Sequence, residues 1–308
     1  STDSCTEEAR VVRLVQGLLG ETDLRMECKP AFDFASTSHQ AELIDGGVVF
    51  TSDSGEKLAL TAPCEFTLEN GTASAEFTLD HGESMAFVLG RLTSANETPS
   101  ALTAEEANDE FRENVEFWRK WVSQCTYQGR WREEVIRSLL ALKLLTFSPT
   151  GAIIAAPTAS LPEEIGGERN WDYRYCWLRD SYFVVHALNR LGVTRTMEGY
   201  LAYINNIVAA TEDGYLQPVF GITQETGLDE RQIDTLKGYN GMGPVRVGNG
   251  AYTQVQNDGY GSVILACAQT FFDQRLSKPG DAILLKRLER LGEQAVKRWD
   301  APDAGLWE

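Results

Sequence analysis

The sequence predicts a β-sandwich domain followed by an all-α domain. Up to about residue 100, short β-rich runs are separated by turn signals. From residue 103 onward, apolar residues recur at helical spacing, and glycine-rich stretches separate the later helices. The 308 residues are enough for two domains, since a domain usually has about 100–200 residues.

The N-terminal part holds seven short runs that alternate or are β-rich, with turn signals such as Asn70-Gly71 and His81-Gly82 between them. Several strands at this spacing are typical of a sandwich. The predicted strands are Arg10–Val15, Asp23–Lys29, Gly47–Thr51, Lys57–Thr61, Glu65–Leu68, Ala73–Leu79 and Met85–Leu89.

Six helices are predicted after the strands. Thr103 and Glu106 form a capping box that starts the first of them. The third is stopped by Gly192. The predicted helices are Thr103–Cys125, Trp131–Phe147, Arg179–Leu191, Thr194–Thr211, Asp258–Leu276 and Asp281–Trp299. Long and short loops alternate between them, which fits a helical barrel.

Composition limits the partners. Acids outnumber bases 45 to 28, and the resulting net charge of −17 disfavours nucleic acid and anionic membranes. We see no apolar run that approaches the roughly 18–20 residues of a membrane span. The six cysteines form no C-x-x-C pair, so neither a metal site nor a cofactor is predicted. A cytoplasmic location is expected, and secretion stays open.

The stretch LPEEIGGERNWDYRYCWLRDS, Leu161–Ser181, combines aromatic residues with arginines and acids. Aromatic rings can cover the apolar face of a sugar, while carboxylates and guanidinium groups bind its hydroxyls. This pattern therefore favours a carbohydrate site. The alternative is a loop whose aromatics pack on a core and whose charges face water, and packing is the favoured role of Tyr173, Tyr175 and Trp177.

This stretch resembles the signature of glycoside hydrolase family 15, which includes glucoamylases, glucodextranases and bacterial-type trehalases. Two later stretches agree in order and spacing: GYNGMGPVRVGNGAYTQVQNDGYG (238–261) and WDAPDAGLWE (299–308). The resemblance implies an (α/α)6 barrel, only partly present in this chain. The implied domains are part of an N-terminal β-sandwich (1–102), a linker helix (103–130) and the first part of the catalytic barrel (131–308).

The resemblance assigns the general acid to Glu308, with Leu306 and Trp307 beside the substrate. Glycoside hydrolysis needs a protonated carboxyl for the leaving oxygen, and an inverting enzyme needs a second carboxylate roughly 6.5–9.5 Å away to activate water. An apolar neighbour such as Trp307 would help keep the acid protonated. Without the resemblance, a Glu at this position would be expected to be a solvated surface residue with no catalytic role.

The resemblance also implies substrate contacts. Arg179 and Asp180 match a pair that grips the terminal sugar, and Trp171 matches an aromatic near the pocket. Asp258 would point toward the sugar, and Arg246 would bind a hydroxyl or carboxylate. Two alternatives stay open: Asp180 stabilises a helix N-terminus, and Asp258 is the N-cap of the next helix.

The family's general base lies beyond this motif, and we find no residue of the chain that matches it. We therefore expect a fragment with about half a barrel. The predicted function is an inverting, exo-acting α-glucoside hydrolase of glucoamylase type that releases glucose from an oligosaccharide or disaccharide. The alternatives are an α,α-trehalase on the same scaffold and a non-catalytic carbohydrate-binding or regulatory protein. The sequence leaves the oligomeric state open.

Overall fold

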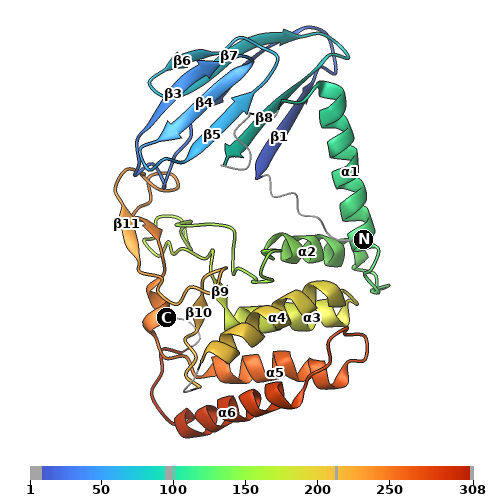
Figure 1. Ribbon diagram of the computed structural model, residues 1–308, viewed down its shortest axis with the longest axis vertical. Coiled ribbons are helices and arrows are strands. Elements are labelled where there is room, and N and C mark those ends of the chain that lie inside the picture. The colour runs from blue at the N-terminus through green and yellow to red at the C-terminus, as the bar shows by residue number, and fades with distance from the viewer. Residues whose placement is uncertain (1–8, 94–98, 100, 212–213, 306–308) are drawn as a thin grey trace. The chain divides into compact units, whose positions relative to one another are not determined.

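The computed structural model describes residues 9–93, 99, 101–211 and 214–305. The chain divides into two compact units, with the boundary between Arg119 and Lys120. The first unit consists of antiparallel strands and most of helix α1, and the second of helices joined by long loops (Figure 1). The predicted order, a β-sheet region before a helical region, is confirmed.

The first unit contains a five-stranded sheet with the order β1-β8-β5-β4-β3 and a three-stranded sheet with the order β2-β7-β6. All neighbouring strands are antiparallel. The strands are β1 (Arg10–Gln16), β2 (Thr22–Cys28), β3 (His39–Ile44), β4 (Gly47–Ser52), β5 (Lys57–Thr61), β6 (Thr67–Glu69), β7 (Thr72–Leu79) and β8 (Ser84–Leu92). Strand β3 is absent from the strands that the sequence predicts.

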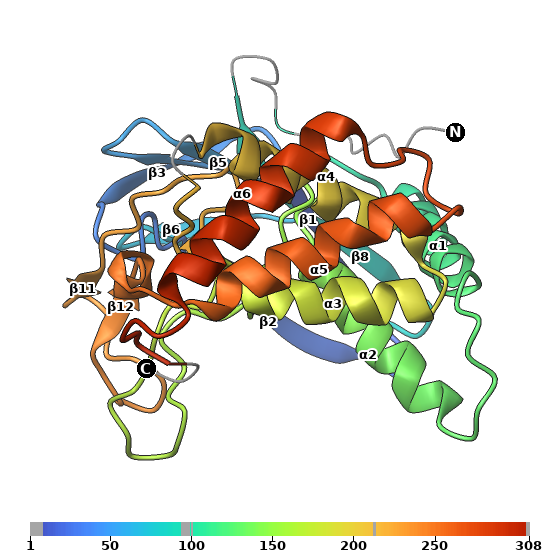
Figure 2. The ribbon, with the colours of Figure 1, turned by 90° about the horizontal axis from the view of Figure 1, so that it is seen from below.

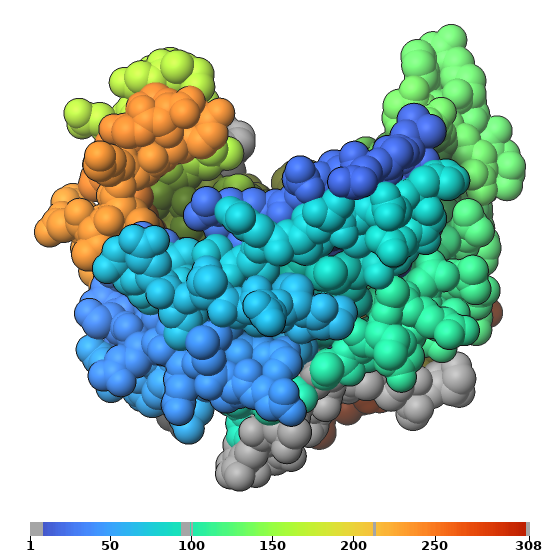
Figure 3. All heavy atoms as spheres, turned by 90° about the horizontal axis from the view of Figure 1, so that it is seen from above, coloured from blue at the N-terminus to red at the C-terminus, as the bar shows by residue number. Residues whose placement is uncertain are grey.

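Both sheets contribute to one apolar core, which makes this unit a sandwich. Val48, Phe50 and Phe87 of the larger sheet are buried in it, and Met26 and Phe77 of the smaller sheet pack against them. Burying each such side chain contributes about 1.5–3 kcal/mol to folding. In Figure 3 the blue and teal atoms of these strands form one continuous body.

Helix α1 (Ala104–Val122) begins where the capping box predicts. The backbone N–H of Thr103 donates to the Glu106 carboxylate at 2.8 Å, and the backbone N–H of Glu106 donates to Thr103 Oγ1 at 3.2 Å. The N–H and the hydroxyl of Thr103, which both donate to this carboxylate, hold the pKa of Glu106 below its ordinary value. Within the same unit, Arg10 of β1 pairs with Glu110 of α1 at 2.6 Å.

The helical unit contains α2 (Arg132–Leu144), α3 (Leu178–Arg190), α4 (Thr194–Ala210), α5 (Asp258–Phe272) and α6 (Ala282–Arg298). Helix α3 contacts α4 and α5, and α5 contacts α6. Figure 2 shows α3 and α5 side by side. Tyr200, Tyr203 and Tyr260 are the largest of the fully buried side chains here. The complete (α/α)6 barrel stays a prediction.

Short strands join the two long loops that precede α3 and α5. Strand β9 (Cys176–Trp177) pairs with β10 (Val219–Phe220), so the loop before α3 lies against the loop before α5. Within the second loop, β11 (Arg231–Ile233) pairs with β12 (Val245–Val247), and a 3-10 helix follows at Gly250–Thr253. In the described ranges we find no helix that could span a membrane.

Candidate active site

Three of the predicted site residues meet where α3 and α5 begin. Arg179 is the second residue of α3, and Asp258 is the first residue of α5. The Arg179 guanidinium donates from Nη1 to Gln256 Oε1 at 2.9 Å and to Asp258 Oδ2 at 3.3 Å. Its Nε lies 3.6 Å from Asp180 Oδ2. One guanidinium thus lies between two carboxylates, and we call these four residues the Arg179 cluster.

The Arg179 cluster can accept hydrogen bonds from a ligand. The side chain of Asp180 is 47% exposed and that of Asp258 is 29% exposed, whereas that of Arg179 is only 18% exposed. Burial raises the pKa of Asp180, the Arg179 charge opposes this rise, and the Asp258 charge adds to it. Both acids lie in the first turn of a helix, where the helix dipole favours negative charge.

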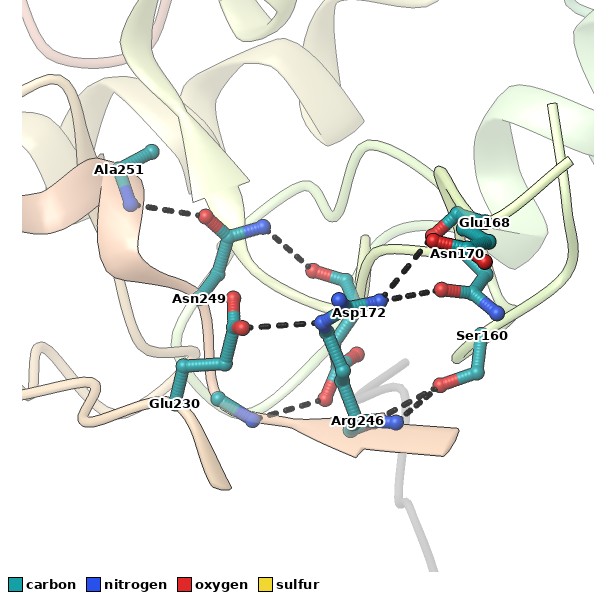
Figure 4. A network of polar contacts seen from close by, with 9 residues as sticks. Ser160, Glu168, Asn170, Asp172, Glu230, Arg246, Asn249 and Ala251 are labelled. Carbon is teal, nitrogen blue, oxygen red and sulfur yellow. Dashed lines mark hydrogen bonds and ion pairs between the residues drawn. The ribbon is translucent and has the colours of Figure 1, made fainter. Parts of the chain in front are cut away.

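Two other predicted residues, Trp171 and Arg246, lie against each other. The Arg246 guanidinium carbon is 4.6 Å from the centroid of the Trp171 ring, a cation–π contact. Arg246 also donates from Nε to Glu230 Oε1 at 3.0 Å and from Nη1 to the side-chain oxygen of Asn170 (Figure 4). Arg246 therefore binds a carboxylate of the protein itself, and its contact with a substrate stays a prediction.

The backbone of Arg246 is fixed as well. The Arg246 N–H donates to Ser160 Oγ at 2.6 Å, and the Ser160 hydroxyl lies 3.0 Å from the Arg246 carbonyl oxygen. Ser160 is buried and has a φ of +63°, a left-handed conformation that is uncommon for residues other than glycine. These contacts join residues 160–172 to β12. We call this set of bonds around Arg246 the Arg246 link.

Asp172 bonds to three other residues of these loops, and the sequence did not predict it as a site residue. Its side chain is fully buried and receives two bonds from Arg174, Nε to Oδ1 at 2.9 Å and Nη2 to Oδ2 at 2.7 Å. The Gly248 N–H donates to Asp172 Oδ2 at 3.3 Å, and Asn249 Nδ2 donates to the Asp172 carbonyl at 3.1 Å (Figure 4). The bonds to Asp172 raise the pKa of the Arg174 guanidinium.

The aromatic residues before α3 pack together, as the sequence favours. Trp177 is buried in a small core cluster with Val219, and Tyr173 and Tyr175 pack against this cluster. The ring centroids of Tyr173 and Trp177 are 5.9 Å apart. Tyr173 also donates from its hydroxyl to Glu163 Oε1 at 3.0 Å. These rings give the loop a rigid apolar support.

A cavity of about 650 Å³ lies in the helical unit, with Arg174, Tyr175 and Glu225 among its lining residues. Its charged groups already have protein partners, since Arg174 binds Asp172 and Glu225 accepts from the Thr223 N–H at 3.0 Å. The Arg179 cluster does not line it. We therefore place the candidate site at the Arg179 cluster.

Metal-binding side chains do not converge in the part of the chain that the structure describes. We find there no group of three or more His, Cys, Asp and Glu residues that could hold an ion. The acids of the Arg179 cluster face a guanidinium instead. This arrangement suits a ligand with hydroxyl groups, since both carboxylates already face the guanidinium and can still accept hydrogen bonds from hydroxyls.

Comparison with known proteins identifies the family. The profile described as "Glycosyl hydrolases family 15" matches residues 129–308, more than half of the chain. The chain belongs to glycosyl hydrolase family 15. A protein named trehalase from Mycobacterium tuberculosis is 36% identical over 97% of this chain and 44% of its own length. A trehalase from Thermoplasma volcanium is 33% identical over 97% of this chain and 46% of its own length.

The chain thus spans about half the length of the curated relatives that it matches. Leu306, Trp307 and Glu308, the predicted acid and its neighbours, lie outside the described residues. The structure does describe the residues that lead to them, up to Gly305. The catalytic role of Glu308 in this glycosyl hydrolase family 15 chain remains a prediction.

The structure brings the predicted residues of this family 15 chain into two groups. Arg179, Asp180 and Asp258 belong to the Arg179 cluster, and Trp171 and Arg246 to the Arg246 link. Gln256 completes the Arg179 cluster, whereas Asp172 binds Arg174, Gly248 and Asn249 next to the Arg246 link, and neither was predicted as a site residue. Gln256 stands two residues before Asp258 in the stretch 238–261, and Asp172 stands two residues before Arg174, where side chains of an extended segment point the same way. Both signals were available in the sequence.

Proposed function

We propose that this chain is part of an inverting α-glucoside hydrolase that acts on α,α-trehalose. The observation that carries this proposal is the likeness, along 97% of the chain, to proteins named trehalase. The glucoamylase-type activity that the sequence favours is not confirmed, and the trehalase alternative is the better supported one. The specific substrate is proposed here from the relatives, because residue types in the Arg179 cluster suit any glucoside.

The Arg179 cluster supports the proposal through its geometry. Asp180 and Asp258 present carboxylate oxygens at adjacent helix N-termini, and each can accept bonds from sugar hydroxyls. Arg179 holds both acids and keeps their spacing fixed. A sugar gripped in this way would be oriented for reaction, which can lower a barrier by several kcal/mol.

In the proposed reaction, the Glu308 carboxyl gives its proton to the glycosidic oxygen as the C1–O bond breaks. A second carboxylate removes a proton from the water that attacks C1 from the opposite face. The attacked glucose leaves as the β-anomer because its centre is inverted. The other glucose keeps its α-configuration, because its own C1–O bond stays intact.

A substrate panel with the complete natural protein tests this proposal. Trehalose, maltose, isomaltose and maltooligosaccharides are offered at equal concentration, and glucose release is measured. We expect glucose from trehalose at a rate well above that from the others. Proton NMR early in the reaction should show α- and β-glucose in equal amounts. Release from maltooligosaccharides with trehalose left intact would return the assignment to a glucoamylase.

The non-catalytic alternative gives a different result in the same experiment. A carbohydrate-binding or regulatory protein would bind saccharides, measured by calorimetry, and release no glucose from any of them. Arg179→Ala in the complete natural protein is the matched variant, because it removes the cation between the two acids. We expect it to weaken saccharide binding whether or not the protein turns the ligand over.

A further inference from the structure

The residues after α6 lie along the residues just before α5. Helix α6 ends at Arg298, and the chain then runs through Trp299–Gly305. The Ala304 N–H donates to the Val255 carbonyl at 2.9 Å, and the Asn257 N–H donates to Asp303 Oδ2 at 3.1 Å. These bonds join the end of this segment to residues 255–257.

Asp303 makes a second bond that shapes its own segment. Its Oδ1 accepts from the Gly305 N–H at 3.0 Å, which closes an Asx turn. Gly305 has a φ of +77°, a conformation that glycine adopts without strain. The two carboxylate oxygens of Asp303 thus accept from different donors: Oδ2 accepts from the Asn257 N–H, and Oδ1 accepts from the Gly305 N–H.

The side chain of Asn257 binds backbone carbonyls at the start of the segment Trp299–Gly305. Its Nδ2 donates to the carbonyl of Arg298 at 3.2 Å and lies 3.5 Å from the carbonyl of Ala301. The segment is therefore attached to Asn257 at its beginning through carbonyl groups and near its end through Asp303. Because its residues 300–305 are exposed, these few bonds have a large share in fixing its path.

These contacts relate the segment to the Arg179 cluster. Asn257 stands between Gln256 and Asp258, both of which bind the Arg179 guanidinium. A shift of Asp303 relative to Asn257 therefore changes where Gly305 lies relative to the cluster. Glu308 follows Gly305 by three residues, so it can be at most about 11 Å along the chain from it.

We infer that Asp303 is a positioning residue that fixes, through Asn257 and Gly305, the direction in which the chain continues toward Glu308. The inference rests on the proposed function, because it concerns the placement of Glu308. Proton transfer to the leaving oxygen depends steeply on placement, and a misplacement of about 1 Å can cost on the order of a hundredfold in rate. Sugar binding by the Arg179 cluster depends on other contacts.

The test compares Asp303→Ala and Asp303→Asn with wild type in the complete natural protein. The substrates are trehalose and α-glucosyl fluoride, whose fluoride leaves without needing a proton from the acid. For Asp303→Ala we expect kcat on trehalose to fall about 10–100-fold with KM changed less than about threefold. The loss on α-glucosyl fluoride should be at least about fivefold smaller. Asp303→Asn should fall between, because its amide has one acceptor oxygen for two donors.

Asp300→Ala is the control, since Asp300 is an exposed acid of the same segment. We expect wild-type kcat on both substrates. Equal losses on trehalose and fluoride for Asp303→Ala, or wild-type rates, would overturn the inference. A melting temperature for each variant shows whether it folds, and Asp303→Asn carries the test if the alanine variant does not. A wild-type protein that spares trehalose but cleaves maltose would reject the proposed function, and the same Asp303 comparison would then be made on maltose.

Discussion

The two units of this molecule place their charges differently. In the β-sheet unit, the Arg25–Glu27 ion pair lies at the surface, with both side chains 59% exposed. In the helical unit, the Asp172 side chain that pairs with Arg174 is fully buried, and the side chain of Arg246 is only 13% exposed. The first unit is held by an apolar core, and the loops of the second by directed polar bonds.

This difference shows which positions tolerate change. Apolar packing constrains volume and accepts many substitutions that conserve it. A buried ion pair constrains direction, because a charge left without its partner in the interior is costly. The helical unit therefore carries the strictest demands on residue type in the same loops that lead to the Arg179 cluster.

The largest expected effect is on chemistry and compares one acid from each unit. Glu308→Gln removes the proposed proton donor, and we expect turnover of trehalose to fall about 10²–10⁴-fold. Glu56→Gln changes an acid of the β-sheet unit that pairs with Arg91, and we expect wild-type turnover. Steady-state kinetics on the complete natural protein measures both. A rate near wild type for Glu308→Gln would show that another group supplies the proton.

The next effect is on stability and compares one ion pair from each unit. Asp172→Asn should lower the free energy of unfolding of the helical unit by about 2–3 kcal/mol. That is less than the roughly 3–5 kcal/mol of a fully buried pair, because Arg174 is 34% exposed. Glu27→Gln, in the exposed pair, should cost less than about 1 kcal/mol.

Urea unfolding followed by tryptophan fluorescence measures this pair of changes. Six of the seven tryptophans follow Lys120, so the fluorescence signal reports mainly on the helical unit. Glu27→Gln is followed by circular dichroism of the β-sheet unit. Similar losses for the two variants would remove the distinction between the units.

The smallest expected effect is a pH dependence. Burial raises the pKa of Asp180, so the folded protein favours its protonated form. The stability that Asp180 contributes is thus present at pH below its ordinary value of 3.8 and is lost as the pH rises through the raised value. Asp180→Asn should therefore melt at or slightly above the wild-type temperature at pH 7, with the difference shrinking toward pH 3.

Asp45→Asn is the matched variant in the β-sheet unit, where Asp45 is exposed in a turn between two strands. We expect its difference from wild type to stay small, because its side chain is exposed. Melting curves across this range distinguish the two positions. If Asp180→Asn were less stable than wild type at pH 7 and this deficit vanished in acid, the direction of the Asp180 shift would be reversed.

Much of the fold follows from local patterns. The capping box at Thr103 and Glu106 predicts the start of α1, because both bonds form within one turn of chain. Strand β3 was missed because Leu43 is exposed beside the half-buried Ile44, which blurs the alternation. Strands β9 and β10 have two residues each, too few for a period, and form only because distant loops meet.

The sequence predicts several residues of the candidate site, but it does not predict the hydrogen bonds and ion pairs between them. Arg179 and Asp258 stand in quoted motifs, but the bond between them joins residues 79 apart, which no local pattern encodes. The sequence left Arg246 without a visible partner because Glu230, which binds it, lies 16 residues earlier, just before β11. Whether a charged side chain finds a partner within the protein depends on which long loops lie together. The packing of the helices determines which loops do so.

The Arg246 link makes the loop of residues 160–172 and the loop that contains Glu230 and β12 depend on each other. Its bonds connect residues 160–172 with Glu230 and β12, so each stretch supplies the anchor of the other. Divergence of this region should then proceed by paired substitutions, and a chimaera that takes one loop from a relative and keeps the other would lose both anchors. Exchanging the two loops together is the smallest change that keeps the contact between the Arg246 guanidinium and the Trp171 ring.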